Sequence, residues 1–166
     1  SILFISTISV LYFYKLKNIF IKCTIFVIIF LYLINILFWI SKNHPFQYVY
    51  FNNLVSKNDI NKKFDLDYWG LSYKQALEKI ISNDNSDKIK IFNLSHNKLF
   101  YTLFSLNNYQ RKKFEVVKNI DQADYVFTNY FMSKKDILLN SNDFSVFYEI
   151  KVDNYIINKI YKKNLN

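Results

Sequence analysis

The sequence predicts a membrane α-helical hairpin followed by a small α/β domain, with a mainly parallel sheet that ends in a C-terminal antiparallel β-hairpin. Two observations predict this. The first forty of the 166 residues carry only Lys15, Lys17 and Lys22 as charges, whereas all 13 acidic residues lie at or beyond Asp59. Further along the chain, short apolar runs alternate with helical patterns, which is typical of βαβ units.

The apolar segment 19–40 predicts a transmembrane helix. At a rise of 1.5 Å per residue, about 20 residues cross the roughly 30 Å hydrocarbon layer of a bilayer. Phe38 and Trp39 would lie at one interface, where aromatic side chains are enriched. Segment 1–14 is too short to span alone, and the chain starts within it at a serine. We therefore expect it to be the end of a truncated transmembrane helix of a longer, multi-pass protein, joined to the next helix by residues 15–18.

The lysines of the connector predict the topology. Short cytoplasmic loops carry an excess of Lys and Arg, so the connector 15–18 is expected in the cytoplasm. Residues 44–166 would then face the periplasm or the cell exterior, and the protein would be integral to the cytoplasmic membrane. A secretory signal is the alternative, but residues 39–42 (WISK) lack the small-residue cleavage pattern.

The domain 44–166 begins with a β-rich segment at 46–51 and a polar loop at 52–63. A helix follows at about 73–82, with Ser72 as its N-cap and Gln75 as the partner in a capping box. The later segments are predicted as strands at 88–93, 113–118 and 125–130, a helix at 98–106, a turn at 121–123, and a hairpin of 144–151 with 155–161 around Asp153-Asn154. A helix at 154–162 is the alternative to the second hairpin strand.

Gly70 is the only glycine of the chain and precedes the predicted N-cap. Glycine adopts backbone angles that a side chain disfavours. We therefore expect a chain reversal at Gly70, after which Trp69 and Leu71 fold onto the first turn of the helix.

Composition excludes several classes of chemistry. A single glycine rules out the glycine-rich phosphate loops of nucleotide-binding proteins, and no cofactor is expected. Two histidines and one cysteine at unrelated positions do not form a metal-ligand pattern. The net charge of +9 suggests nucleic acid, but the residues after position 40 mix the other 19 basic residues with 13 acidic ones, so we expect no nucleic-acid partner.

The candidate binding residues are Asp65, Asp67, Tyr68 and Trp69 in the stretch FDLDYWG. In an extended segment, carboxylates two residues apart point to the same face. Beside two aromatic rings they would hold sugar hydroxyls by hydrogen bonds while the rings stack on the sugar. The alternative is that the aromatic residues belong to the core and the acids cap a helix or face solvent.

Three stretches, HPFQYVYFNNLV, FDLDYWGLSYKQALEKI and ADYVFTNY, resemble the C-terminal end of bacterial multi-pass membrane glycosyltransferases similar to the protein O-mannosyltransferases. That family has a last spanning helix followed by a small soluble domain. The closing residues Val152-Asp153-Asn154 and Ile160-Tyr161-Lys162 are also similar, although relatives often have glycine in place of Asn154.

The resemblance implies transfer of a sugar from a polyprenyl-phosphate carrier to an outward-facing acceptor by inverting displacement. The family's general base is an acidic residue of the first outward loop, sometimes with a divalent metal near the carrier phosphate. That region precedes these 166 residues, so no catalytic residue is carried over. The soluble domain would aid acceptor binding or stability, and the alternative is a non-enzymatic, membrane-anchored binding or assembly domain.

Overall fold

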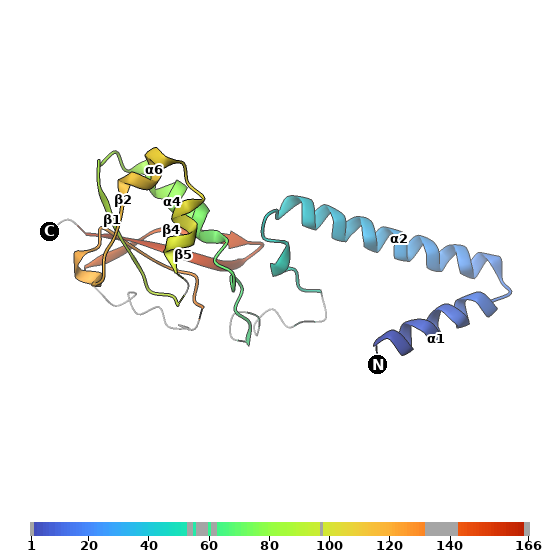
Figure 1. Cartoon of the computed structure of the whole chain (residues 1–166). Helices are drawn as coiled ribbons and strands as arrows, with labels where there is room; N and C mark the ends of the chain where they lie inside the picture. Colours follow the sequence, from blue (N-terminus) through green and yellow to red (C-terminus); the bar gives the residue numbers. More distant parts are fainter. Residues whose placement is uncertain are drawn as a thin grey trace. The chain divides into compact units, whose positions relative to one another are not determined.

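The computed structural model describes residues 2–52, 55, 60, 63–96, 98–131 and 143–164 (Figure 1). The chain divides into two compact units, Ser1–Gln47 and Tyr48–Asn166. This division follows the change from apolar to mixed composition along the sequence.

The first unit consists of helices α1 (Ile2–Lys15) and α2 (Ile19–Lys42). Asn18 caps α2, because its side-chain oxygen accepts the backbone N–H groups of Phe20 and Ile21 at 2.9 and 3.4 Å. By length and composition, α2 is the one helix among the described residues that could cross a membrane. The long apolar helix predicted at 19–40 is thus confirmed and continues to Lys42, whereas the role of α1 and the cytoplasmic connector stay predictions.

The second unit contains a five-stranded sheet in the order β2-β1-β3-β5-β4. The strands are β1 (Ile89–Asn93), β2 (Phe114–Val116), β3 (Tyr125–Thr128), β4 (Phe144–Val152) and β5 (Tyr155–Lys163). Strand β1 pairs in parallel with β2 and β3, whereas β5 is antiparallel to β3 and β4. The sheet is therefore mixed, and the prediction of a mainly parallel sheet is wrong. The reason is that the C-terminal hairpin joins the parallel strands edge to edge through β5.

The predicted C-terminal hairpin is confirmed. Asp153 has a φ of 51°, a left-handed conformation that Asp tolerates better than most residues, and it reverses the chain between β4 and β5. The alternative helix at 154–162 is therefore wrong. The β4–β5 register shifts between Val146 and Tyr148 and again between Ile150 and Lys151, which marks two irregularities of the bulge type along β4.

Helix α4 (Ser72–Asn83) covers one face of the sheet. Its fully buried side chains recur at helical spacing and are Tyr73, Ala76, Leu77 and Ile80. The Tyr73 ring meets the ring of Phe127 on β3 edge to face, with centroids 5.1 Å apart. A second cluster, made of Ala123, Val126, Phe144 and Tyr161, is packed by the partly buried Phe92, Leu94, Val117 and Ile120.

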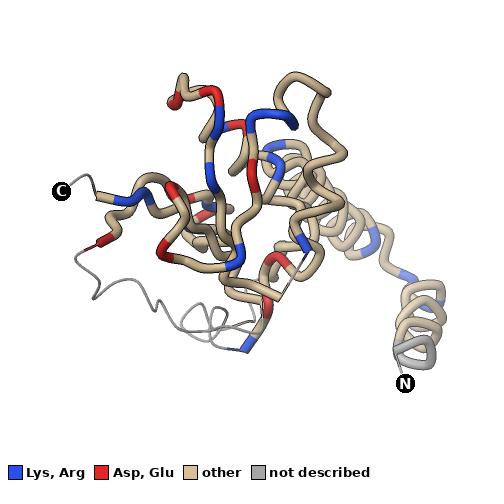
Figure 2. The backbone as a smooth tube through the Cα atoms, turned by 60° about the vertical axis from the view of Figure 1, so that its left-hand side comes forward, with Lys and Arg blue, Asp and Glu red and all other residues tan. Residues whose placement is uncertain are grey.

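Charged side chains of both signs occur throughout the second unit. Figure 2 shows Lys and Arg interspersed with Asp and Glu along its backbone. Lys159 is buried and pairs with Glu149 at 3.4 Å, and Glu149 also pairs with Lys151 at 2.7 Å. Hydrogen bonding to Lys151 is the main cause that lowers the pKa of Glu149.

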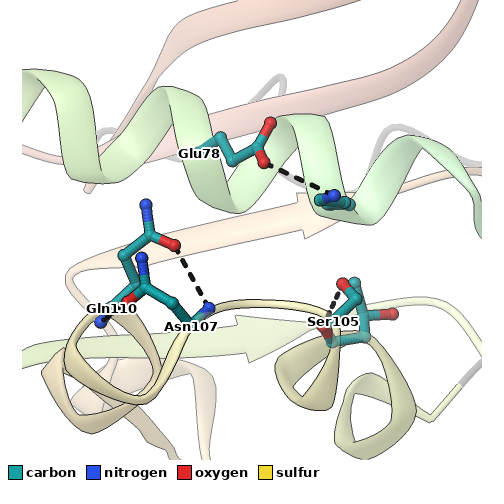
Figure 3. Close-up of polar contacts among 6 residues, drawn as sticks. Glu78, Ser105, Asn107 and Gln110 are labelled. Atoms are coloured by element: carbon teal, nitrogen blue, oxygen red, sulfur yellow. Dashed lines mark hydrogen bonds and ion pairs between the residues drawn. The ribbon is translucent and has the colours of Figure 1, made fainter.

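Two short helices follow β1: α5 (Leu99–Phe104), within the helix predicted at 98–106, and α6 (Asn108–Lys113), which was not predicted. Asn107 and Gln110 form a capping box at the start of α6: the Gln110 N–H donates to the Asn107 side chain at 2.8 Å, and the Asn107 N–H donates back at 3.4 Å (Figure 3). This pattern was readable in the sequence, but six mostly polar residues lack the apolar periodicity of a helix.

The predicted β-rich segment at 46–51 is wrong. Gln47–Val49 forms a single turn of 3-10 helix, η1, and no described strand pairs with it. The side chain of Val49 is buried, and the Tyr48 hydroxyl donates to Asp67. The apolar and aromatic residues of this segment therefore pack into the fold although the segment is not a strand. Most of the loop predicted at 52–63 lies outside the described residues.

Because α4 packs on the sheet, shortening one of its buried side chains should leave a cavity and lower the free energy of unfolding. Leu77 is fully buried, so Leu77→Ala should lower the free energy of unfolding by about 2–5 kcal/mol. The exposed Gln75 on the same helix gives the matched control, because Gln75→Ala should change it by no more than about 0.5 kcal/mol. Urea unfolding of the whole chain in detergent micelles, followed by near-ultraviolet circular dichroism, measures both. Equal effects would show that α4 is not packed as described.

Candidate functional site

The single glycine of the chain allows a tight turn before α4. Gly70 has a φ of 67°, the left-handed region that glycine enters without steric cost. Its N–H donates to the Asp67 carbonyl at 3.0 Å, and its own carbonyl accepts the Tyr73 N–H at 3.2 Å. The predicted chain reversal at Gly70 is confirmed, and it places the side chain of Asp67 beneath the first turn of the helix.

Asp67 is fully buried and is the acceptor at the centre of a hydrogen-bond network. Oδ1 accepts the Tyr48 hydroxyl at 2.5 Å and the Leu71 N–H at 3.0 Å. Oδ2 accepts the Ser72 hydroxyl at 2.5 Å and the Ser72 N–H at 3.3 Å, with the Asn129 amide at 3.5 Å. The carboxylate therefore accepts two of the backbone N–H groups at the start of α4, where negative charge also complements the helix dipole.

This arrangement corrects the predicted capping box. Ser72 is the first helical residue and Leu71 is the N-cap, with no side-chain cap of its own. Asp67 reaches the helix from outside it and takes the place that sequence spacing assigned to Ser72 and Gln75. The Ser72 hydroxyl instead donates to Asp67 and accepts the Asn158 amide at 2.7 Å.

The network continues from Asp67 to the sheet. The Asn129 amide donates to the Asp67 carbonyl at 2.7 Å. The Tyr73 hydroxyl lies 3.1 Å from the Asn129 side-chain oxygen and 3.2 Å from that of Asn93, so it shares its proton between these two acceptors. The network thus links residues from a turn, a helix and three strand regions. Among the buried side-chain nitrogen and oxygen atoms of the described residues, only the Asn158 side-chain oxygen has no hydrogen-bond partner.

Burial dominates the titration of the network. Desolvation raises the pKa of Asp67, although hydrogen bonds from Ser72, Tyr48 and Asn129 partly oppose it. Burial also raises the pKa of Tyr73 to about 12, and burial together with the Asp67 charge raises the pKa of Tyr48. Both tyrosines therefore remain hydrogen-bond donors at neutral pH.

The network lies at the carboxyl edge of two neighbouring parallel strands. Asn93 ends β1 and Asn129 directly follows β3. Strands β1 and β3 are neighbours in the sheet. The strand that follows β1 in the chain, β2, lies beside β1 on one side of this pair, whereas the strands that follow β3, β4 and β5, lie on the other side. Such a reversal of direction is a topological switch point, where open α/β sheets bind ligands outside the carboxyl ends of the strands.

Side chains fix the loops that leave this edge. The Ser95 and Thr128 hydroxyls are 3.0 Å apart, and the Asn129 N–H donates to Ser95 at 3.0 Å. Tyr130 has a φ of 61°, which is uncommon for a bulky residue, and its N–H donates to Thr128 at 3.0 Å. The exit from β3 is therefore held in a strained conformation of the kind that clusters at functional sites.

Exposed aromatic rings lie beside the buried network. Trp69 is 73% exposed and Tyr68 is 49% exposed, with ring centroids 5.0 Å apart. The Tyr68 ring is 4.8 Å from the ring of Phe131, which is 6.4 Å from His96. We call Tyr68, Trp69 and Phe131 the aromatic turn. It presents apolar ring surface at the switch point of the sheet.

The four predicted site residues separate into two kinds. Asp65 is exposed and Asp67 is buried, so the expectation that both acids share one face is wrong, because residues 66–69 form a turn and not an extended segment. The interpretation of Tyr68 and Trp69 as core residues is also wrong, and Trp69 and Leu71 do not fold onto the helix but are exposed. Asp67 caps a helix, as the alternative interpretation held for the acids. A substrate-binding role for these four residues stays a prediction.

Sequence reasoning missed the partners of Asp67, which are Tyr48, Ser72, Asn129 and, through Ser72, Asn158. A usable signal existed for two of the asparagines at this edge. Asn93 and Asn129 lie at the end of the strands predicted at 88–93 and 125–130, and carboxyl ends of adjacent parallel strands meet at one edge. No signal in the sequence linked Tyr48 or Asn158 to Asp67.

Comparison of the chain with family models, with curated proteins and with solved structures found no match.

The raised pKa of Asp67 predicts how stability depends on pH. An acid with a higher pKa in the folded state binds more protons there than in the unfolded state, between the two pKa values. The Asp67 contribution is therefore most favourable below about pH 4, near the unfolded value, and decreases as pH rises through the folded pKa. Asp67→Asn should lower stability, and its deficit relative to the unchanged chain should shrink as pH rises from about 4 to 8.

Thermal unfolding of both forms in detergent micelles across this pH range measures the deficit. Asp65→Asn is the matched control, because Asp65 is exposed, and its curve should run parallel to that of the unchanged chain. A constant deficit for Asp67→Asn would show that Asp67 does not titrate differently in the folded state.

Proposed function

We propose that the chain is the C-terminal part of an integral membrane glycosyltransferase that transfers a sugar from a polyprenyl-phosphate donor to an extracytoplasmic acceptor. In this proposal the second unit binds the acceptor. The observation that carries the acceptor role is the exposed Trp69 of the aromatic turn, which lies two residues after the buried Asp67 in the sequence. The resemblance of the DYWGLSY stretch to membrane glycosyltransferases supplies the reaction class.

The exposed rings suit a carbohydrate acceptor. A sugar ring has an apolar face of C–H groups, and the electron-rich face of an aromatic ring attracts such groups. Trp69 and Tyr68 meet edge to face, so two differently oriented ring surfaces are offered side by side. Peptide acceptors that carry aromatic or apolar side chains would use the same surface.

The buried network would hold this surface rigidly. Asp67 immediately precedes Tyr68, and its carboxylate is bonded to α4 through Leu71 and Ser72. Tyr48 and Asn129 add bonds from distant parts of the sequence. A binding surface that is already ordered loses less conformational entropy on binding, which favours affinity.

In the proposed reaction an acceptor hydroxyl oxygen attacks the anomeric carbon of the donor sugar. The bond from that carbon to the carrier phosphate oxygen breaks, the polyprenyl phosphate leaves, and a general base takes the hydroxyl proton. The resemblance assigns the base to an acidic residue upstream of these 166 residues. Among the described residues, no three His, Cys, Asp or Glu side chains lie together as a candidate metal site.

A non-enzymatic, membrane-anchored binding or assembly domain is the second candidate. The observation that favours it is that Asp67 accepts hydrogen bonds from groups within the fold on both of its oxygens. A carboxylate so engaged acts as a structural support and not as an acid or base. The aromatic turn would then bind a partner without any transfer reaction.

Removal of the Trp69 ring tests the proposed function. In membranes that carry the complete protein, Trp69→Ala should lower kcat/KM for the acceptor by roughly 30-fold, corresponding to about 2 kcal/mol for an aromatic face buried on binding. Trp69→Phe should retain most of the activity. Transfer of labelled sugar from a polyprenyl-phosphate donor is the measurement, and Val146→Ala, at an exposed apolar residue on β4, is the control.

Each outcome separates the candidates. Transfer that is insensitive to Trp69→Ala would remove the aromatic turn from acceptor binding. Absence of transfer by the unchanged complete protein with every polyprenyl-phosphate donor tried would favour the binding or assembly domain.

The proposed orientation predicts which cysteines an impermeant maleimide labels. In a Cys23→Ser background, a cysteine at the exposed Ser145 should react in sealed right-side-out vesicles, whereas one at Lys17 should react only after permeabilisation. Labelling at Lys17 in sealed vesicles, with Ser145 protected, would reverse the orientation.

A further inference from the structure

Helices α5 and α6 expose a group of aromatic side chains that the proposed sugar site does not use. Phe100 is 60% exposed, Tyr101 73%, Phe104 57% and Tyr109 72%. These rings form local contacts, since the Phe100 ring lies 4.7 Å from Phe104 and 5.7 Å from Tyr101. Four exposed aromatic side chains on two short helices are unusual for a surface that faces only water. They indicate that this surface binds another molecule or a membrane.

Cationic side chains accompany these rings. The Arg111 guanidinium lies over the Phe104 ring at 4.8 Å, and the Lys113 ammonium lies 5.4 Å from the Tyr109 ring. Lys112 is exposed, and its carbonyl accepts the Lys88 ammonium at 2.9 Å. We call Phe100, Tyr101, Phe104, Tyr109 and the basic residues 111–113 the α5–α6 face.

Charge is locally segregated along this part of the chain. Between Asp87 and Glu115 there is no acidic residue, while the basic residues there are Lys88, Lys90, Lys98, Arg111, Lys112 and Lys113. This basic segment is not evident from the charge of the whole unit, because acidic residues elsewhere in the unit offset it. The partner of the α5–α6 face is therefore expected to carry negative charge and to accept aromatic rings.

The chain connection favours a membrane as that partner. Only residues 43–47 separate the end of α2 at Lys42 from Tyr48, which begins the second unit. Six Cα steps span about 20 Å at most, and a unit of this size has a radius of gyration of roughly 14 Å. If α2 spans the bilayer, this short connection keeps the second unit close to the lipid headgroups.

We propose that the α5–α6 face binds the bilayer surface, with the aromatic rings at headgroup level and Arg111, Lys112 and Lys113 against anionic lipid phosphates. Aromatic side chains concentrate at this depth of the membrane, and juxtamembrane basic clusters bind anionic lipids. Tyrosine and phenylalanine flanked by basic residues are also typical of helices that lie in the interface. This inference does not depend on the sugar-transfer proposal.

A spin label tests the contact. The whole chain, with Cys23→Ser and Tyr101→Cys, is labelled with a nitroxide and placed in nanodiscs of phosphatidylcholine with or without phosphatidylglycerol. In discs with the anionic lipid, the label at 101 should become accessible to oxygen and protected from a water-soluble nickel chelate. A label at Ser145 should stay accessible to the chelate in both discs, because this residue is exposed on β4, away from the α5–α6 face in the sequence.

Charge-matched triple variants separate local from overall charge. Arg111→Ala with Lys112→Ala and Lys113→Ala should shift the docking equilibrium by roughly 100-fold toward the undocked form, at about fivefold per charge. Lys74→Ala with Lys118→Ala and Lys151→Ala removes the same charge from exposed positions elsewhere and should leave the protection at 101 nearly unchanged. Circular dichroism of each variant confirms that the fold is kept.

Three outcomes would overturn the proposal. These are equal exposure of the labels at 101 and 145 in anionic discs, equal effects of the two triple variants, and protection that is independent of the anionic lipid. Tight binding of a single-stranded oligonucleotide to the α5–α6 face, without lipid protection at 101, would assign the face to nucleic acid.

Discussion

The second unit depends on one buried carboxylate. Asp67 joins η1, the start of α4 and the exit of β3, through Tyr48, Ser72 and Asn129. A buried charge is costly unless hydrogen bonds compensate it, and this one accepts donors on both oxygens. The same bonds that offset part of the cost of burying this charge also fix three segments far apart in the sequence to one another. Gly70 is needed because only the tight turn places the carboxylate under the helix.

From this anchor the arrangement of the edge follows. The Asp67 network reaches Asn93 through Tyr73, so the helix start and the ends of β1 and β3 form one hydrogen-bonded assembly. Its polar atoms face inward, and the rings of Tyr68 and Trp69 lie on the outside. The edge therefore presents an aromatic surface supported by a polar interior, which explains why residues adjacent in the sequence have opposite burial.

The elements that the sequence predicted well are those with a local signal. These signals are the apolar run of α2, the helical periodicity of α4, the positive φ at Gly70 and the Asp153-Asn154 turn. Each is encoded by residues that are neighbours in the sequence. The arrangement of the sheet depends on which strand the hairpin pairs with, and nothing local to Tyr155 or its neighbours specifies that choice. For the site, the aromatic pair and Asp67 were identified, but the burial of Asp67 depends on Tyr48 and Asn129, which lie 19 and 62 residues away in the chain.

The irregular register of β4 has a consequence for association. This strand is an edge of the described sheet, and an edge strand with regular, free N–H and C=O groups recruits strands from other molecules. Two shifts near Val146 and Ile150, together with the charged side chains of Glu149 and Lys151, interrupt that regular array. A second copy of the chain would thus find no continuous template for strand pairing here, and the edge resists fibre-like self-assembly.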